Sequence, residues 1–248
     1  MGLSVTVLGS SAMYATAQRA ASGYLVDIDG FKLWMDAGGG TWQRLLQYVD
    51  YTDLDGVLLS HRHPDHTIDV FQCFHARLYG GQTVEHIPLW APQETLDHMT
   101  AFSPELSQAF DLKAIEIGAV LDIAGAKTSF YKMAHPPVTY GIRIEHDGCV
   151  LAYTADTGPA GDLHGLARDA DVFICEATFQ DTDQPWWEGH MSATQAGQAA
   201  SDVGAKRLVL THLPAERDLG LSLQEARAAA GSAEVELAEE RPILEVGG

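Results

Sequence analysis

Short runs in which apolar residues predominate fill the first third of the chain. Runs of this length, bounded by turn residues, are typical of β-strands. Asp29-Gly30 stands between two of them, where a hairpin turn would fit. The pattern predicts strands at Ser4–Leu8, Tyr24–Ile28, Phe31–Met35 and Gly56–Leu59. Longer amphipathic segments predict helices at Trp42–Val49, Thr67–Leu78 and Glu94–Phe102.

Strands and helices alternate in the second half of the chain. We expect strands at Lys127–Met133, Tyr140–Glu145, Cys149–Thr154, Val172–Cys175 and Arg207–Leu210, and helices at Ala193–Asp202 and Ser222–Ala230. Strands that first pair locally and then alternate with helices favour two sheets packed face to face, with helices outside. The sequence therefore predicts an α/β fold, a four-layer αββα sandwich. No linker interrupts the pattern, so we expect a single domain over residues 1–248.

Composition and charge limit the classes of function. The 248 residues include 15 Lys and Arg against 34 Asp and Glu, which gives a formal net charge of −19. That balance argues against a protein that grips long nucleic acids, since such a grip needs a cationic surface. No apolar stretch approaches the ~18 residues of a membrane helix. Because the first residues resemble a strand and not a leader, we expect a cytoplasmic protein without a membrane contact.

One segment, Ser60-His61-Arg62-His63-Pro64-Asp65-His66, concentrates metal-binding side chains directly after an apolar strand. Side chains alternate between faces in an extended segment, so His61 and His63 can point toward one metal ion. Asp65 and His66 lie at the entry to the next helix and can face a second ion. The alternative is that Asp65 caps the helix and the histidines are surface residues.

Three further ligand candidates follow later strands. His135, Asp156 and His212 each come within two residues of the end of a predicted strand. Side chains at the carboxyl ends of strands gather at one rim of an α/β fold. Each alone would be an ordinary turn residue, but together with the histidine segment they favour a dinuclear metal centre. The three cysteines show no C-x-x-C spacing, which argues against a thiolate zinc site.

These residues, in this order, resemble the ligand motifs of the metallo-β-lactamase superfamily of dinuclear hydrolases. Ser60–His66, Tyr153–Gly158 and Thr211-His212 are most similar to its ribonuclease Z and phosphodiesterase branch. The resemblance implies the αββα sandwich of that superfamily and two divalent ions. It assigns His61, His63 and His135 to one ion, Asp65, His66 and His212 to the other, and Asp156 to both. Nitrogen and oxygen ligands suit zinc, which we expect, and leave Mn²⁺ and Fe²⁺ open.

The resemblance also implies a mechanism, in which a hydroxide that bridges the ions attacks the substrate and Asp65 orients it. Glu176 and His190 resemble the pair that phosphodiesterases of this branch use near the leaving oxygen. His190 is then the candidate general acid, with Glu176 fixing its tautomer. The alternative is a histidine at a helix entry and a buried structural glutamate. Asp36 resembles a carboxylate that braces a ligating imidazole, or forms a turn.

Substrate class follows from three observations. Asp156 stands where zinc β-lactamases have Cys, and the Glu176–His190 pair favours phosphoester chemistry. Only 20 residues separate His135 from Asp156, too few for the arm with which ribonuclease Z grips its substrate. We therefore expect a phosphodiesterase for small or cyclic phosphate esters. The alternatives are a hydrolase of carboxylic esters, lactones or sulfates, a ribonuclease Z-like nuclease and, least favoured, a non-catalytic metal-binding protein.

Two further features bear on the substrate pocket. Trp186 and Trp187 directly precede Gly189-His190. Their indoles either stack on a base or ribose, or form a hydrophobic plug or a dimer contact, so a homodimer stays open. Arg19, in the loop between the first two strands, either approaches a phosphate or serves solubility alone.

Overall fold

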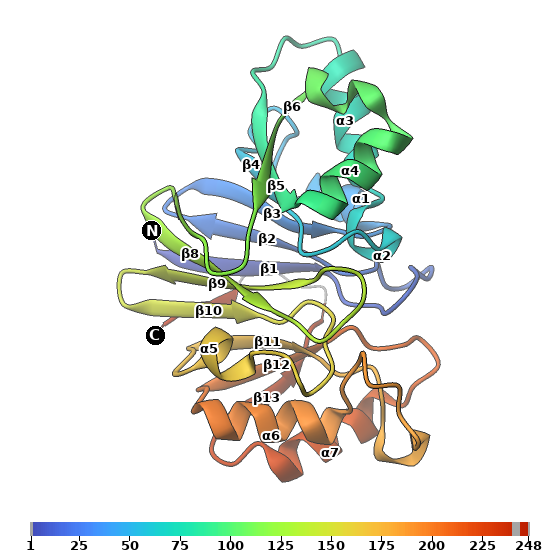
Figure 1. Cartoon of the computed structure of the whole chain (residues 1–248), viewed down its shortest axis with the longest axis vertical. Helices are drawn as coiled ribbons and strands as arrows, with labels where there is room; N and C mark the ends of the chain where they lie inside the picture. The colour runs from blue at the N-terminus through green and yellow to red at the C-terminus, as the bar shows by residue number, and fades with distance from the viewer. Residues whose placement is uncertain (1, 240–243, 248) are drawn as a thin grey trace.

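The computed structural model describes residues 2–239 and 244–247, which form two seven-stranded sheets packed face to face (Figure 1). The strand order is β14-β1-β2-β3-β4-β5-β6 in the first sheet and β13-β12-β11-β10-β9-β8-β7 in the second. Helices cover the outer face of each sheet, with α1, α3 and α4 on one side and α5, α6 and α7 on the other. The result is the predicted four-layer sandwich.

The first sheet begins as an antiparallel meander and continues with parallel strands. Its strands are β1 (Leu3–Gly9), β2 (Gly23–Ile28), β3 (Phe31–Ala37), β4 (Gly56–Leu58), β5 (Ile87–Pro92), β6 (Phe110–Ile115) and β14 (Leu244–Glu245). The helices of this half are α1 (Thr41–Leu45), α2 (Pro64–Thr67), α3 (Val70–Tyr79) and α4 (Gln93–Phe102), followed by the 3-10 turn η1 (Pro104–Gln108).

The second sheet has the same design, antiparallel from β7 to β10 and parallel from β10 to β13. Its strands are β7 (Val120–Ile123), β8 (Ala126–Lys132), β9 (Tyr140–His146), β10 (Cys149–Tyr153), β11 (Val172–Glu176), β12 (Arg207–Thr211) and β13 (Glu234–Leu237). The helices are α5 (Leu163–Ala167), η2 (Asp181–Asp183), α6 (Ala193–Val203) and α7 (Leu219–Ala229).

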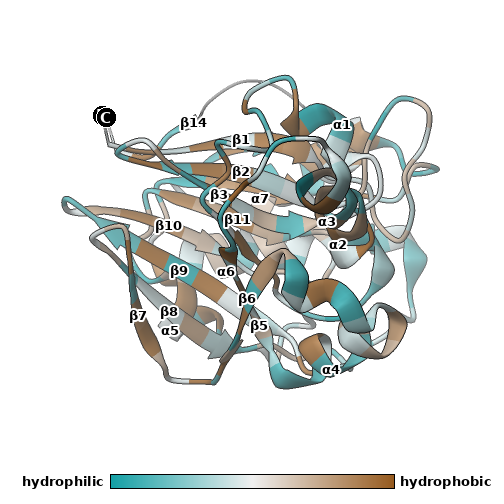
Figure 2. Ribbon diagram, turned by 90° about the horizontal axis from the view of Figure 1, so that it is seen from above, coloured by the Kyte–Doolittle hydropathy of each residue, from teal (hydrophilic) through white to brown (hydrophobic). Residues whose placement is uncertain are grey.

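Alternating side chains along the strands build separate apolar layers. On β2, Tyr24 and Val26 face the core between the sheets, whereas Leu25 faces the helices of the first half. On β11, Ile174 belongs to the central core and Phe173 to the layer beneath α6. Figure 2 shows the consequence from above, with hydrophobic colour along the strands and mixed colour on α3 and α4. Each sheet is thus buried on both faces.

The structure confirms the predicted sandwich, and every predicted strand lies within two residues of its expected bounds. The elements that the sequence does not predict are β5, β6, β7, β13, β14 and α5. Within the described residues, no helix has the length and apolar character needed to cross a membrane. The predicted single domain, residues 1–248, extends over positions 1, 240–243 and 248, which lie outside the described residues.

Three of the predicted helices differ from the observed ones. The helix predicted over Ser222–Ala230 begins three residues earlier, at Leu219. The helix predicted over Thr67–Leu78 is two helices, α2 and α3, with Asp69 between them. The Asp69 carboxylate accepts the backbone N–H of Trp42 at 2.8 Å, which ties this junction to the start of α1. The helix predicted from Trp42 ends early, at Leu45, and continues as turns.

Both sheets deliver polar residues to one edge of the sandwich. The strands β3 and β4 of the first sheet and β8, β10 and β12 of the second all run toward this edge. The histidine segment follows β4, and His135, Asp156 and His212 follow β8, β10 and β12. Carboxyl ends of strands are where α/β folds collect their functional groups.

Candidate metal centre

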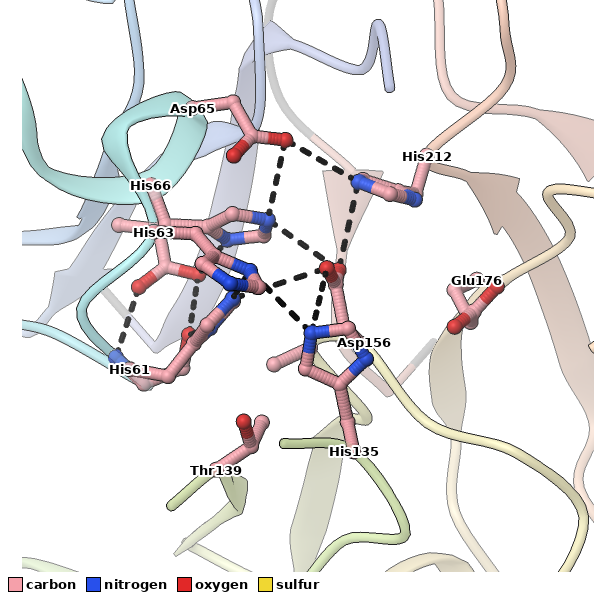
Figure 3. A network of polar contacts seen from close by, with 12 residues as sticks. His61, His63, Asp65, His66, His135, Thr139, Asp156, Glu176 and His212 are labelled. Atoms are coloured by element: carbon pink, nitrogen blue, oxygen red, sulfur yellow. Dashed lines mark hydrogen bonds and ion pairs between the residues drawn. The ribbon is translucent and has the colours of Figure 1, made fainter. Parts of the chain in front are cut away.

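The histidine segment is a short loop between β4 and α2. His63, with an extended backbone (φ −63°, ψ 144°), is the residue that precedes the helix, and Pro64 occupies its first position. Asp65 lies inside the first turn of α2, so the alternative in which Asp65 caps this helix is wrong. Its carboxylate is turned instead toward His66 and His212 (Figure 3).

The seven ligand candidates lie together in two groups, as Figure 3 shows. The first group is His61, His63, His135 and Asp156, and the second is Asp65, His66 and His212. Within each group, one nitrogen or oxygen atom per residue lies within 4.8 Å of the corresponding atoms of the others. The grouping matches the assignment that the family resemblance implies, in which Asp156 is shared.

Asp156 lies between the two groups and turns one oxygen to each. Its Oδ2 is 3.6 Å from Nε2 of His61 and 3.6 Å from Nε2 of His135. Its Oδ1 is 3.1 Å from Nε2 of His66 and 3.4 Å from Nε2 of His212. A carboxylate in this position can bind two cations at once.

Partners behind the imidazoles fix the orientation of the rings. His66 Nδ1 donates to Asp36 Oδ2 at 2.7 Å, and His135 Nδ1 donates to the carbonyl oxygen of Gly189 at 2.9 Å. Nδ1 of His61 contacts Ser60 Oγ at 3.0 Å, and Nδ1 of His212 contacts Thr178 Oγ1 at 2.9 Å. With Nδ1 occupied, Nε2 of each ring is directed inward as a ligand.

The imidazole ring of His63 has the opposite orientation to the other four rings. Its Nδ1 faces the cluster, 3.2 Å from Nε2 of His61 and 3.2 Å from Nε2 of His135. Burial lowers the pKa of His63 to about 4 and also lowers the pKa of His61. These imidazoles are therefore neutral at neutral pH, which is the form that binds metals.

Asp36 holds the His66 ring in place and forms a hydrogen bond between the two sheets. It is fully buried at the end of β3. Its carboxylate accepts the Ser60 N–H at 2.8 Å, the Ser60 hydroxyl at 2.7 Å and the phenol of Tyr153, from β10, at 2.8 Å, in addition to His66. The sequence left two interpretations of Asp36, a carboxylate that supports a ligating imidazole and a residue that forms a turn. Its contact with His66 is that of a supporting carboxylate.

Two buried atoms indicate that the cluster is built for cations. His66 Nε2 and Asp156 Oδ1 have no hydrogen-bond partner in the described part of the chain. Buried polar atoms are almost always partnered, because an unpartnered one costs free energy. Burial alone would lower the pKa of His66, but the charges of Asp156, Asp36 and Asp65 raise it well above its ordinary value. A bound divalent ion would satisfy this negative field, and the nitrogen and oxygen donors fit one.

Glu176 and His190 form a pair beside the second group. His190 Nδ1 donates to Glu176 Oε1 at 2.7 Å, and Glu176, fully buried, also accepts the N–H of Thr157 at 2.7 Å and the hydroxyl of Thr178 at 2.8 Å. The His190 ring stacks on His212 with centroids 5.2 Å apart. Burial alone would lower the pKa of His190, but Glu176 raises it to about 9.

The other predicted residues lie at the edge of the centre. Trp186 Nε1 donates to the carbonyl oxygen of Gln180 at 3.0 Å, within its own loop. Trp187 is half exposed and contacts the rings of the centre. Arg19 Nη2 donates to the carbonyl oxygen of Leu213 at 2.7 Å, so it holds the β1–β2 loop to the residue after His212.

The sequence analysis did not identify three residues that support the candidate metal centre. Tyr153 and Thr178 hold Asp36 and His212 from behind, and their places near Asp156 and Glu176 in the chain were the available signal. Met13 gave no signal. Its backbone N–H donates to Asp65 Oδ2 at 2.8 Å, from a left-handed backbone (φ 63°) in the β1–β2 loop.

Comparison with known proteins finds relatives along most of the chain. The family described as beta-lactamase superfamily domain matches residues 32–213. The probable metallo-hydrolase YhfI of Bacillus subtilis is 31% identical over 217 residues, 86% of this chain and 87% of that protein. The crystal structure of YhfI, a metallo-beta-lactamase fold protein, has a TM-score of 0.90 at 27% identity, covering 99% of this chain and 100% of that chain.

Two further matches have lower sequence identity. A ribonuclease Z of Kineococcus radiotolerans is 27% identical over 298 residues, 98% of this chain and 95% of that protein. The crystal structure of a diphosphatase from the PhnP family has a TM-score of 0.79 at 18% identity, covering 98% of this chain and 97% of that chain. At this identity the diphosphatase shows a shared fold alone.

Proposed function

Because the chain belongs to the metallo-β-lactamase superfamily of hydrolases, we propose that it is a dinuclear metal-dependent phosphodiesterase for small or cyclic phosphate esters. The observation that carries the proposal is the Glu176–His190 pair beside the ligand cluster. Cleavage of a phosphodiester with an alkyl leaving group needs a proton on the departing oxygen, and a positioned histidine can supply it.

The ligand set determines where the ions would bind. His61, His63, His135 and Oδ2 of Asp156 would hold one ion, and Asp65, His66, His212 and Oδ1 of Asp156 the other. Divalent ions there would supply a Lewis acid for the phosphoryl oxygens and a water activated at neutral pH. We propose zinc, and the nitrogen and oxygen donors also suit Mn²⁺ or Fe²⁺.

Asp65 would orient the attacking water, and His190 would move a proton. Asp65 Oδ2 is fixed by the Met13 N–H at 2.8 Å, and the carboxylate would orient the water by accepting a hydrogen bond from it. His190 gives the proton on Nε2 to the departing alkoxide, while Glu176 holds the proton on Nδ1. The neutral imidazole regains a proton from solvent before the next turnover.

The shape and charge of the chain favour a small substrate. The residues between His135 and Asp156 form the β9–β10 hairpin and its flanking loops, which leaves no insertion at the place of the ribonuclease Z arm. A net charge of −19 repels a long polyanion at long range, whereas a single phosphate responds to the local field of two cations. The 27% identity to a protein named ribonuclease Z favours an RNA nuclease as the second candidate.

Substrate assays on the metal-loaded protein test the proposal. Bis(p-nitrophenyl) phosphate, nucleoside cyclic phosphates, p-nitrophenyl acetate, a lactone and a precursor tRNA are offered in parallel, and bound metal is counted by elemental analysis. We expect two ions per chain, turnover of the phosphodiesters and no trimming of the tRNA. Efficient tRNA trimming at physiological salt would establish the second candidate, and turnover of the acetate or lactone alone would overturn both.

A further inference from the structure

Two adjacent tryptophans precede His190, and their surroundings differ. Trp186 is half-buried, and its Nε1 donates to the carbonyl oxygen of Gln180. Its position is therefore explained by this contact within the loop. Trp187 has 51% of its surface exposed. An exposed indole forgoes much of the free energy that burial of so large an apolar side chain would provide. Its position therefore needs an explanation other than loop stability.

Trp187 lies at the wall of the candidate metal centre. Its ring centroid is 5.5 Å from that of His135 and 5.2 Å from that of His190, with interplanar angles of 76° and 66°. Edge-on contacts of this kind are favourable between aromatic rings. The rings of His135 and His190 are themselves 4.9 Å apart, so the indole lies against both a candidate ligand and the candidate acid.

Glycines and an ion pair hold the indole in this place. A Cβ added to Gly189 would collide with the six-membered ring of Trp187, so the ring rests directly on the glycine backbone. A Cβ added to Gly158 would collide with the carbonyl oxygen of Glu188, the next residue along. On the other side of the loop, Arg217 binds Asp183 at 2.8 Å. The loop thus presents a positioned ring.

We propose that Trp187 forms an aromatic subsite that takes the base of a nucleotide whose phosphate lies at the metal centre. The inference rests on the proposed function for the position of the phosphate. Every nucleobase has a flat, uncharged face that can stack on an indole, and the negative charge of the chain does not oppose that contact. The subsite would therefore select nucleotides over other phosphate esters without selecting one base.

Equilibrium binding tests the subsite without requiring turnover. The metal-loaded protein is titrated calorimetrically with adenosine 5′-monophosphate and with ribose 5-phosphate, which carry the same phosphate and differ in the base. We expect tighter binding of the adenosine compound to the unaltered chain. In Trp187→Ala its Kd should rise by about 5- to 150-fold, the range of one lost base stack, while that of ribose 5-phosphate stays unchanged.

Matched variants separate stacking from structural support. Gly189→Ala should reproduce the loss with the indole still present, because the added methyl group displaces the ring. Trp187→Phe, which keeps an aromatic face at this position, should keep most of the difference in affinity between the two compounds. Metal content and thermal unfolding of each variant show that the fold and the centre persist.

Three outcomes would overturn the subsite. These are equal affinity of the two compounds for the unaltered chain, a parallel loss of both in Trp187→Ala, and a change of oligomeric state in that variant with the affinities preserved. A change of oligomeric state with preserved affinities would show that Trp187 forms a dimer contact. If phosphodiesters are not hydrolysed but the base still adds affinity that Trp187→Ala removes, the subsite stands and the proposed function falls.

Discussion

Histidine and aspartate gather at both ends of the sandwich, but in different ways. At the rim described above, the ligand candidates follow strands of both sheets. At the other end of the same strands, three hairpin turns meet, and His146 Nε2 lies 2.9 Å from Oδ2 of Asp29 and 3.9 Å from Oδ2 of Asp147. This hairpin cluster, defined by His146, Asp29 and Asp147, also has ligand atoms within 4.8 Å of one another.

Burial distinguishes the two clusters. The Asp29 and Asp147 side chains are 43% and 83% exposed, so water solvates their charges. At the rim, Asp156 is buried, and its Oδ1 lies 3.1 Å from Nε2 of His66, although neither atom has a hydrogen-bond partner in the described part of the chain. Proximity of His and Asp is therefore no sign of a metal site by itself. Buried ligand atoms without a hydrogen-bond partner, on rings that are hydrogen-bonded through their other nitrogen, are the better sign.

The largest expected difference between the clusters is in turnover. Asp65→Ala should abolish phosphodiester hydrolysis while the fold persists, because this carboxylate belongs to the second ligand group and would also orient the attacking water. Asp29→Ala, in the hairpin cluster, should leave kcat unchanged. The measurement is kcat on bis(p-nitrophenyl) phosphate, with circular dichroism as the control for folding. An unchanged kcat in Asp65→Ala would remove the assigned role of Asp65.

His190→Ala should slow hydrolysis selectively. An alkoxide of high pKa needs a proton as it leaves, whereas p-nitrophenolate does not, so alkyl and nucleoside esters should lose about 10²- to 10⁴-fold in kcat. The nitrophenyl ester should change little, and His146→Ala should affect neither. An equal loss on both esters would indicate phosphate binding or support, and a loss of metal would make His190 a ligand, since it lies within reach of Asp156 and His212.

Asp36→Asn should weaken metal binding by about 10- to 100-fold, the usual effect of losing a carboxylate behind a ligating histidine. Asp29→Asn is the matched change in the hairpin cluster and should leave metal affinity unaltered. Tyr153→Phe, which removes only the phenol bonded to Asp36, should act in the same direction with a smaller effect and less risk to folding. Competition with a chelator measures each affinity. Equal affinities in all three variants and the parent would contradict the bracing role.

The smallest effect should come from His146→Gln, which we expect to lower the free energy of unfolding by less than about 1 kcal/mol, as for other ion pairs near the surface. The hydrogen bond to Asp29 raises the pKa of His146 in the folded chain. Its contribution is therefore complete below the unfolded value of about 6.5 and disappears as the pH rises through the raised value.

Urea denaturation of parent and variant checks this at about pH 5.5, below the unfolded pKa of histidine, and at about pH 9, well above it. The difference between the two proteins should be present at the lower pH and absent at the higher one. A difference that grows with pH would show that the sign is wrong.

Much of the fold was predictable because the inner strands have long apolar runs and clear turns. Strand β5, Ile-Pro-Leu-Trp-Ala-Pro, was not, since proline within a run argues against an inner strand. The structure accommodates both prolines because β4 pairs with β5 only at Leu89 and Trp90. Strand β13, Glu-Val-Glu-Leu, was missed because a four-residue run with two glutamates carries too little apolar signal.

The candidate site was predictable to the extent that its residues follow strands. His61, His135 and Asp156 each lie three residues after the end of a strand, so a correct list of strands places them at the rim. The Met13 N–H that contacts Asp65 comes from an irregular loop, and no pattern of side chains reports where a backbone amide will point. The role of Tyr153 could not be predicted for another reason. It stands among apolar residues in the sequence, as a core residue would, and only the structure shows that its phenol donates to Asp36.

The division of the candidate ligands between the two sheets, four and three, has a thermodynamic consequence. His61, His63, Asp65 and His66 follow a strand of the first sheet, and His135, Asp156 and His212 follow strands of the second. An ion held by both sets is a crosslink between halves of the chain that are far apart in sequence. Its binding free energy is then linked to folding, so resistance to unfolding should increase with the concentration of free metal. Separation of the two sheets would release the ions, and the ions in turn would hold the sandwich closed.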